Sequence, residues 1–169
     1  MPSLFHVVLH EPEIPNNTGN IGRTCVATGC GLHLIRPLGF DVSEKACRRA
    51  GLDYWPRLGV REYDGLDAFF AAHPGVRPRT WILSTKATRC VFDADFQPGD
   101  VMLFGKETRG LPDHVLEQFS ATALRMPMIA GERSLNLATA VCAVVYEGVR
   151  QAIARGQVRL ADGKLVLPA

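Results

Sequence analysis

Short apolar runs bounded by Gly, Pro and Asp alternate along the chain with longer segments whose apolar residues recur at helical spacing. The short runs predict β-strands and the longer segments predict helices. This alternation is typical of the α/β class, and it predicts a single-domain, mostly parallel sheet flanked by helices. The predicted strands cover residues 4–9, 32–37, 58–63, 80–85, 100–105 and 121–127, and the predicted helices cover residues 17–28, 43–50, 65–73, a short segment from Pro112, and 134–154.

The last predicted helix is apolar on nearly every side. Ser134 stands at its predicted N-cap, and Asn136 follows within the first turn. A helix that is apolar on every side is expected to be buried on every side. In so small a chain one of those sides fits a subunit interface, so the pattern predicts a homodimer. The apolar positions are Leu135, Leu137, Val141, Val144, Val145, Val149 and Ile153.

Three of the predicted strands, 80–85, 100–105 and 121–127, run into loops that are rich in Gly, Pro or small polar residues. In open α/β sheets, ligands bind beyond the carboxyl ends of the strands. The three loops are therefore expected to build one pocket.

Length and composition fit one ordinary core. The chain has 169 residues, of which 47% are hydrophobic and 21% charged, and this size predicts one domain. We expect the domain to span residues 1–154 and a C-terminal tail to span 155–169. In that tail an Asp-Gly pair lies between two short alternating runs, which favours a small hairpin or a frayed end.

Charge and cysteine content limit the partners. The formal net charge of +2 permits contact with a polyanion without requiring it. Five cysteines at irregular spacing give neither a disulfide framework nor a zinc-ribbon pair, which indicates a reducing, cytoplasmic location and no metal site. No run reaches the roughly 20 apolar residues that span a bilayer, and no signal peptide is evident. We therefore expect no membrane partner.

Several motif interpretations fail on spacing. The segment FGKET is similar to the end of a phosphate-binding P-loop, but Asp100 stands where that loop needs a glycine. Gly29 and Gly31 lack the third glycine of a dinucleotide fingerprint and are explained by a helix C-cap. Cys30 and Cys142 could be nucleophiles, but cysteines in apolar surroundings are more often core residues.

The segment IPNNTGNIGRTC places small polar residues and an arginine at the start of a predicted helix. Asn16, Asn17 or Thr18 can cap the free amides. Asn20 and Arg23 share one face of that helix. A helix N-terminus beside a guanidinium suits a phosphate. The alternative is an ordinary N-cap followed by a solvent-facing arginine.

The segment LFGKETRGLP follows a predicted strand and carries Lys106, Glu107 and Arg109 between Gly105 and Gly110. Its glycines let the backbone approach a ligand closely, and its charged residues could pair with each other or with a substrate. The alternative is a solvated charged turn.

Together with MPMIAGERSLNLATAVCAVVYEGVRQ, these segments resemble the three motifs of the SPOUT class of RNA methyltransferases, the α/β knotted family. NNTGNIGRTC resembles motif one, LFGKETRGLP motif two and the later segment motif three, in the same order and over nearly the whole chain. Since no further RNA-binding domain accompanies them, the chain is similar to the minimal tRNA (cytidine/uridine-2'-O-)-methyltransferases, which act at the wobble nucleotide.

The resemblance implies transfer of a methyl group from S-adenosylmethionine to a ribose 2'-hydroxyl in the anticodon stem-loop of tRNA. It also implies a C-terminal deep trefoil knot, with the last third of the chain threaded through a loop. A third implication is a homodimer packed through the first and last helices.

By motif position, the resemblance also implies site residues. Ser134 and Asn136 would orient the ribose, Arg23 would act on the 2'-hydroxyl proton, and Lys106 stands where the family usually has a smaller or neutral residue. Cofactor contacts are expected at Leu83, Gly105, Glu107, Gly110, Met126, Met128, Ile129 and Ser134. RNA contacts are expected at Asn16, Asn20, Arg23, Lys106, Arg109, Arg133 and Tyr146, of which Tyr146 could instead serve the dimer.

The role of Arg23 has two interpretations, because a guanidinium is effectively always protonated. It could take the proton, as the family assignment implies. It could instead clamp the adjacent phosphate and stabilise developing alkoxide charge while a phosphate oxygen or water takes the proton. Displacement from a sulfonium needs no metal, so the protein mainly positions and desolvates the reactants.

Two rival functions stay open at this point. Methylation of ribosomal RNA would use the same three motifs. A catalytically silent RNA-binding dimer would use a phosphate-contacting surface made of Arg23, Arg48, Arg49, Lys106, Arg109 and Arg133.

Overall fold

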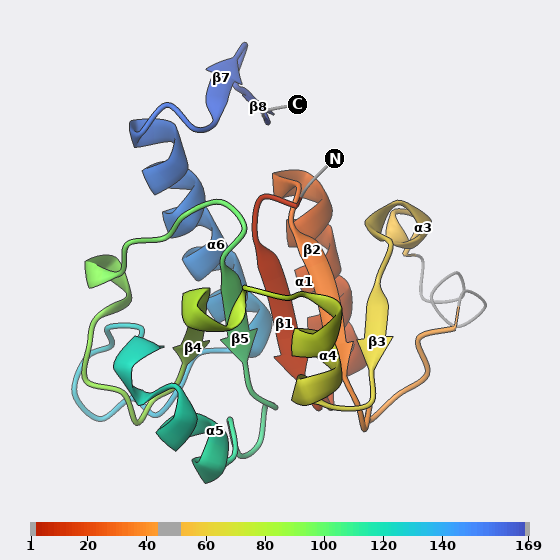
Figure 1. The fold of residues 1–169 in the computed structure, drawn as a ribbon, viewed down its shortest axis with the longest axis vertical. Helices are drawn as coiled ribbons and strands as arrows, with labels where there is room; N and C mark the ends of the chain where they lie inside the picture. Colours follow the sequence, from red (N-terminus) through yellow and green to blue (C-terminus); the bar gives the residue numbers. More distant parts are fainter. Residues whose placement is uncertain (1–2, 44–51, 168–169) are drawn as a thin grey trace.

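The central sheet is parallel throughout. The computed structural model describes residues 3–43 and 52–167, and six of its strands form one sheet in the order β3-β2-β1-β5-β4-β6 (Figure 1). Every neighbouring pair in this sheet is parallel, as the sequence predicts. The strands are β1 (His6–His10), β2 (Gly31–Ile35), β3 (Arg61–Tyr63), β4 (Thr80–Leu83), β5 (Val101–Phe104) and β6 (Ala123–Leu124).

Helices cover both faces of the sheet. On one face α1 (Pro15–Thr28) and α6 (Leu137–Ala154) pack against each other and bury the side chains of Val7 and Leu9 from β1. On the other face α4 (Leu66–Ala72) and α5 (Asp113–Gln118) cover Val8 and Leu103. Among the described residues, the remaining short helices are α3 (Trp55–Leu58), η1 (Arg77–Arg79), η2 (Val91–Asp93) and η3 (Ser120–Thr122).

Two predicted strands are shorter than their sequence pattern indicates. The strand predicted at 58–63 is only β3, because the preceding residues form α3 and Gly59 ends that helix in the left-handed region at φ 58°. The strand predicted at 121–127 is reduced to β6, because its first residues belong to η3. The helix predicted at 43–50 lies outside the described residues except for Ser43.

Helix α6 begins later than predicted, and the predicted cap is wrong. Its N-cap is Asn136, whose Oδ1 accepts hydrogen bonds from the amides of Ala138 (2.9 Å) and Thr139 (3.3 Å). Ser134 lies outside the helix, in the loop that leads to it. Asn136 can act as the cap because a further contact, described below, fixes its side chain.

In the single chain α6 is buried on only part of its surface, so the prediction that a second copy covers the remaining side stays a prediction. Val141, Val144 and Val145 are buried in the core, but Thr139, Ala143, Tyr146 and Arg150 form an exposed stripe at helical spacing. By length and composition alone, α6 could cross a membrane, but the core helix of a soluble protein meets the same criterion.

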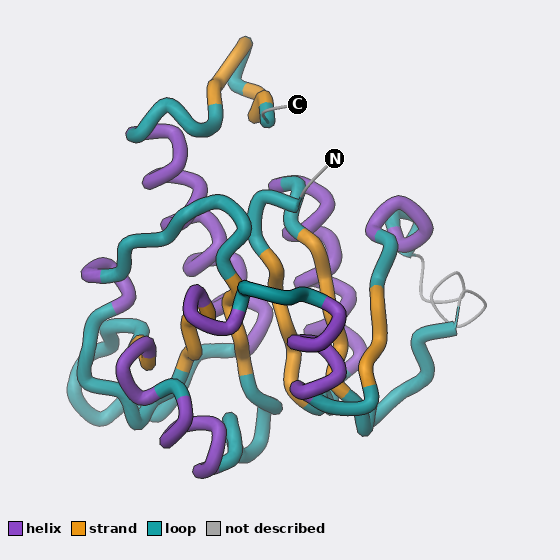
Figure 2. Tube along the Cα trace, in the orientation of Figure 1, coloured by secondary structure: helices purple, strands orange, loops and turns teal. Residues whose placement is uncertain are grey.

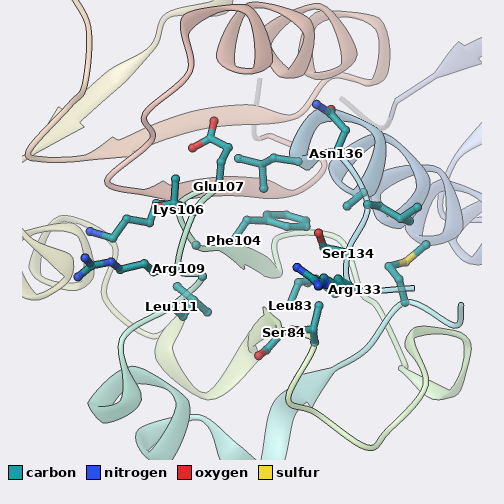
Figure 3. A pocket seen from close by; sticks show the side chains of 18 of the residues that line it. Leu83, Ser84, Phe104, Lys106, Glu107, Arg109, Leu111, Arg133, Ser134 and Asn136 are labelled. Atoms are coloured by element: carbon teal, nitrogen blue, oxygen red, sulfur yellow. The ribbon is translucent and has the colours of Figure 1, made fainter. Parts of the chain in front are cut away.

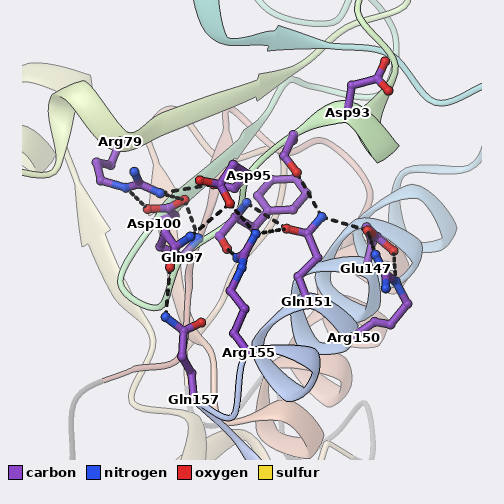
Figure 4. Close-up of polar contacts among 12 residues, drawn as sticks. Arg79, Asp93, Asp95, Gln97, Asp100, Glu147, Arg150, Gln151, Arg155 and Gln157 are labelled. Carbon is purple, nitrogen blue, oxygen red and sulfur yellow. Dashed lines mark hydrogen bonds and ion pairs between the residues drawn. The ribbon is translucent and has the colours of Figure 1, made fainter.

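Polar contacts fix the C-terminal part of α6 to the segment before β5 (Figure 4). Gln151 accepts a hydrogen bond from the Phe96 amide at 3.0 Å and donates one to the Ala94 carbonyl at 2.9 Å. The buried carboxylate of Asp100 accepts hydrogen bonds from Arg79 and from the Trp81 indole. Because buried polar groups need such partners, these contacts stabilise the fold rather than form a site.

The tail forms a hairpin, which is one of the two alternatives that the sequence leaves open. Strands β7 (Arg159–Ala161) and β8 (Lys164–Val166) pair antiparallel around Asp162 and Gly163, both of which have positive φ. Figure 2 shows this hairpin beyond the end of α6 and outside the six-stranded sheet, and Leu165 and Leu167 of the tail pack against the core. The predicted knot stays a prediction.

Candidate functional site

A pocket of about 560 Å³ lies beyond the carboxyl ends of β4 and β5 and beside the start of α6 (Figure 3). This is the position that the loop pattern predicts. Its walls come from the loops that follow β4, β5 and β6, and from the start of α1. The lining residues include Ile14, Asn17, Leu83–Lys86, Phe104–Leu111, Met126, Met128 and Arg133–Leu137.

The loop after β5 doubles back tightly on itself. The Gly110 amide donates to the Lys106 carbonyl at 3.0 Å, and Gly110 has a φ of 70°. A Cβ on Gly105 would lie 2.3 Å from the backbone nitrogen of Leu111. Position 105 therefore accepts only glycine without a shift of the backbone, which gives a physical reason for this glycine in the segment LFGKETRGLP.

The start of α1 is bound by a carboxylate of the protein itself. Glu107 accepts hydrogen bonds from the backbone amides of Glu13 (2.9 Å) and Ile14 (3.2 Å) and from Asn17 Nδ2 (3.0 Å). A negative charge at a helix N-terminus is also favoured by the helix dipole. Glu107 thus holds the place that the sequence interpretation gives to a substrate phosphate.

The capping prediction for α1 is wrong. The helix begins at Pro15 after Ile14, which makes no side-chain cap, so Asn16, Asn17 and Thr18 all lie inside the first turn. Pro15 explains the earlier start, since proline is favoured in the first turn, where its missing amide costs nothing. Its predicted end at Gly29 is confirmed, with a φ of 72°.

Asn17 joins the three sequence segments. Its Nδ2 donates to Glu107, and its Oδ1 accepts from Asn136 Nδ2 at 2.9 Å. Asn17 is only 6% exposed, so both ends of its amide have a partner inside the protein. The orientation of Asn136 beside the pocket is set by this contact on one side and by the α6 amides on the other.

A second set of contacts ties the loop after β5 to the loop after β1. Lys106 Nζ lies 2.5 Å from Glu11 Oε2, and this hydrogen bond lowers the pKa of Glu11. Glu13 accepts hydrogen bonds from the Thr108 amide (3.1 Å) and hydroxyl (2.8 Å). Lys106 therefore lines the pocket with its charge already paired.

Arg109 and Arg133 also line the pocket, and both are exposed. Within residues 3–43 and 52–167, neither guanidinium has a carboxylate partner. Their charges are available to an anionic ligand at the pocket mouth.

The predicted site residues divide into two groups. Eleven line the pocket: Leu83, Gly105, Lys106, Glu107, Arg109, Gly110, Met126, Met128, Arg133, Ser134 and Asn136. The others lie outside it. Ile129 lies beside the pocket and is 79% exposed. Asn16, Asn20 and Arg23 are exposed on α1, and Tyr146 belongs to the exposed stripe of α6. Arg48 and Arg49 lie outside the described residues.

Sequence reasoning missed several pocket residues. Ser84, Thr85 and Lys86 follow β4 directly, so the rule that located the pocket could have identified them. The sequence pattern predicts a capping role for Asn17, and it predicts only a strand residue at Phe104 and a loop residue at Leu111, which together form an apolar wall of the pocket.

Comparisons with known proteins agree with this geometry. The SpoU rRNA Methylase family matches residues 4–146. The chain is 48% identical over 149 residues to the tRNA (cytidine(34)-2'-O)-methyltransferase of Acidovorax sp. (strain JS42), covering 88% of this chain and 92% of that protein. It is also 48% identical over 149 residues to the protein of the same name from Saccharophagus degradans, covering 88% of this chain and 96% of that protein.

Solved structures of RNA methyltransferases also match this chain. A structure that concerns the 2-OH methylation of C/U34 on tRNA matches with a TM-score of 0.81 and 45% identity, covering 92% of this chain and 100% of that one. The SpoU methyltransferase AviRb from Streptomyces viridochromogenes, solved in complex with the cofactor AdoMet, matches with a TM-score of 0.77 and 25% identity. That match covers 91% of this chain and 60% of AviRb.

Proposed function

The chain belongs to the SpoU rRNA methylase family, and from that premise we propose that it methylates the ribose 2'-hydroxyl of nucleotide 34 in tRNA, with S-adenosylmethionine as methyl donor. The observation that carries the proposal is the 48% identity, over nearly the full length of both chains, to proteins named for that reaction. The pocket formed by all three motif segments supports it.

The pocket fits the proposed cofactor. Its volume of about 560 Å³ lies within the usual range for small-molecule sites, and it combines apolar walls with a few polar groups. Leu83, Met126 and Leu111 would hold the apolar parts, and the backbone between Gly105 and Gly110 would meet the polar groups. When bound, S-adenosylmethionine supplies a methyl group on a positively charged sulfur leaving group.

The chain's own residues mainly orient the ribose and exclude water. Ser134 and Asn136 stand at the pocket where they could hold the ribose, and Arg109 and Arg133 at its mouth suit the RNA backbone. Arg23 does not line the pocket of its own chain. A role for it in the reaction therefore requires a second copy of the chain.

We infer that this second copy packs through α1 and α6, the pair of helices that lie together on one face of the sheet. Arg23 and Asn20 on α1, and the stripe that includes Ala143 and Tyr146 on α6, are exposed in the single chain. A homodimer through these helices would cover the stripe and bring Arg23 toward the partner's pocket.

Three further proposals accompany the proposed function. They are a cytoplasmic location, a methyltransferase domain at residues 1–154 with a tail at 155–169, and the C-terminal knot.

The test is transfer of a labelled methyl group from S-adenosylmethionine to tRNA that lacks its wobble ribose methylation, followed by nuclease mapping. Label in a 2'-O-methylated dinucleotide at position 34 is the expected result. Methyl transfer to ribosomal RNA but not to tRNA would identify ribosomal RNA as the substrate instead. If calorimetry detects no binding of S-adenosylmethionine, the result would favour the rival function of a catalytically silent RNA-binding dimer.

Arg23→Ala tests the proposed catalytic contact. Loss of one electrostatic contact to the transition state typically costs about 3 kcal/mol, so kcat is expected to fall on the order of a hundredfold. An Arg23→Ala enzyme that methylates at the wild-type rate would remove Arg23 from the mechanism.

A further inference from the structure

The side chain of Arg23 lies over an aromatic ring of its own chain. Its guanidinium carbon is 4.6 Å from the ring centroid of Tyr54, a residue directly before α3. Tyr54 is only 3% exposed, and its hydroxyl donates to the Gly19 carbonyl at 2.5 Å. Gly19 lies one helical turn before Arg23, so one tyrosine contacts α1 twice on adjacent turns.

Two glycines of α1 make room for this tyrosine. A Cβ on Gly22 would lie 3.3 Å from Tyr54 Cε2 and 2.9 Å from Leu58 Cδ2, and a Cβ on Gly19 would lie 3.7 Å from the Tyr54 hydroxyl. Glycine is unfavourable inside a helix, so two of them on one face need a packing reason. The close approach of the segment that carries Tyr54 supplies it.

The ring has two physical effects on Arg23. An arginine side chain has many rotamers, and contact with a fixed ring reduces their number. The face of an aromatic ring attracts a cation, so the contact also holds the charged guanidinium over the ring. Within the described parts of the chain, 3–43 and 52–167, no carboxylate pairs with Arg23, so its charge is not neutralised there.

We propose that Tyr54 is a positioning residue for the proposed methyl transfer: it holds Arg23 extended from α1 as a cation, ready to meet the phosphate or the developing alkoxide of the substrate. This inference rests on the proposed function. It favours the electrostatic role of Arg23 over the role of proton acceptor, because an acceptor would have to lose the charge that the ring stabilises.

A double-mutant cycle tests the proposal. Tyr54→Leu removes the ring and is expected to lower kcat about tenfold, the scale of one cation–π contact, with cofactor affinity unchanged in calorimetry. In an Arg23→Ala background the same change is expected to have no further effect on kcat, because Tyr54 acts through Arg23. Tyr54→Phe keeps the ring and is expected to retain kcat within about twofold.

The control is Leu58→Ala, since Leu58 packs on the same turn of α1 but is not the ring beneath Arg23. It is expected to lower the unfolding temperature while leaving kcat unchanged. If Tyr54→Leu and Arg23→Ala reduce kcat independently, so that their effects multiply, Tyr54 has only a structural role and the proposal is overturned.

Fluorinated phenylalanines at position 54 provide a second measurement in which the shape of the ring is kept. Added fluorines weaken the negative face of the ring, so kcat is expected to fall stepwise as fluorines are added. A constant kcat across the series contradicts the proposal. Wild-type protein assayed in parallel distinguishes failure of the proposed methyl transfer from failure of the proposed role of Tyr54. Absence of methyl transfer by the wild type overturns both hypotheses. Normal transfer by the wild type, with independent effects of the Tyr54 and Arg23 substitutions, overturns only the role of Tyr54.

Discussion

Asn136 donates a hydrogen bond to Asn17 across 119 positions of sequence, at 2.9 Å, and so joins the N-terminus of α6 to the first turn of α1. Asn17 in turn donates a hydrogen bond to Glu107. The three segments that line the pocket are therefore fixed to one another by a continuous chain of side-chain hydrogen bonds.

Asn17→Ala is expected to lower both stability and cofactor affinity. The change leaves Asn136 Nδ2 without its partner and removes one of the donors to Glu107. Loss of a hydrogen bond typically costs about 0.5–1.5 kcal/mol, and loss of one to a charged group such as the Glu107 carboxylate costs more. Urea unfolding and calorimetric titration with S-adenosylmethionine measure the two effects. Asn16→Ala is the matched control, since Asn16 is exposed on the same turn; equal effects of the two variants would contradict a linking role for Asn17.

Glu107→Gln is expected to loosen the loop after β5 from the start of α1. The carboxylate accepts hydrogen bonds from two backbone amides and from Asn17, and an amide can accept on only one of its two terminal atoms. We expect a loss of about 1–3 kcal/mol in unfolding free energy, with weaker cofactor binding. Glu117→Gln, at an exposed position on α5, should change neither, and unaltered unfolding of Glu107→Gln would show that the charge is unimportant.

The location of the pocket could be predicted from the sequence because it follows from local patterns. Strands that end in Gly-rich loops share one edge of a parallel sheet, and this rule places Leu83 and Gly105 correctly beside the pocket. The contacts of Asn17 could not be predicted, since Glu107 lies 90 positions away, and an asparagine near a helix start fits a cap equally well.

The same limit explains the misplaced start of α6. Ser134 and Asn136 are both good N-cap residues, so the local sequence does not choose between them. The tertiary contact with Asn17 favours Asn136 as the cap. Likewise, the apolar run at 58–63 favours a strand by local pattern, and the packing of Trp55 and Leu58 against α1 makes its beginning helical instead.

Arg109→Ala and Arg133→Ala are each expected to weaken tRNA binding and to reduce its salt dependence. Both guanidiniums line the pocket mouth and are exposed, and a lost phosphate contact lowers the slope of log K against log salt by about 1. Lys106→Ala is the matched comparison, because Lys106 is paired with Glu11 and should contribute less. If Lys106→Ala changes the salt slope more than the arginine variants do, Lys106 contributes more to tRNA binding than Arg109 and Arg133, and this prediction is wrong.

The stability of the fold is expected to fall in acid because of a histidine cluster remote from the pocket. His33 on β2 is 4% exposed, and its Nε2 lies 3.0 Å from His6 Nδ1 while its Nδ1 lies 3.1 Å from the Tyr63 hydroxyl. Burial, followed by the nearby His6, His73 and Arg61, lowers the pKa of His33 from 6.5 to about 3. The pKa values of His6 and His73 are also lowered, first by burial.

Because the folded pKa of His33 lies below the unfolded one, the unfolded chain binds more protons between pH 6.5 and about 3. The contribution to stability is complete above pH 6.5 and is lost as the pH falls through this window, at up to about 1.4 kcal/mol per pH unit for each proton. Urea unfolding between pH 8 and 4 measures the slope. His33→Gln is expected to be less stable at pH 8, since its buried partners lose contacts, but to show a shallower slope. The exposed His114 offers the control His114→Gln; if His33→Gln keeps the wild-type slope, the acid sensitivity arises elsewhere.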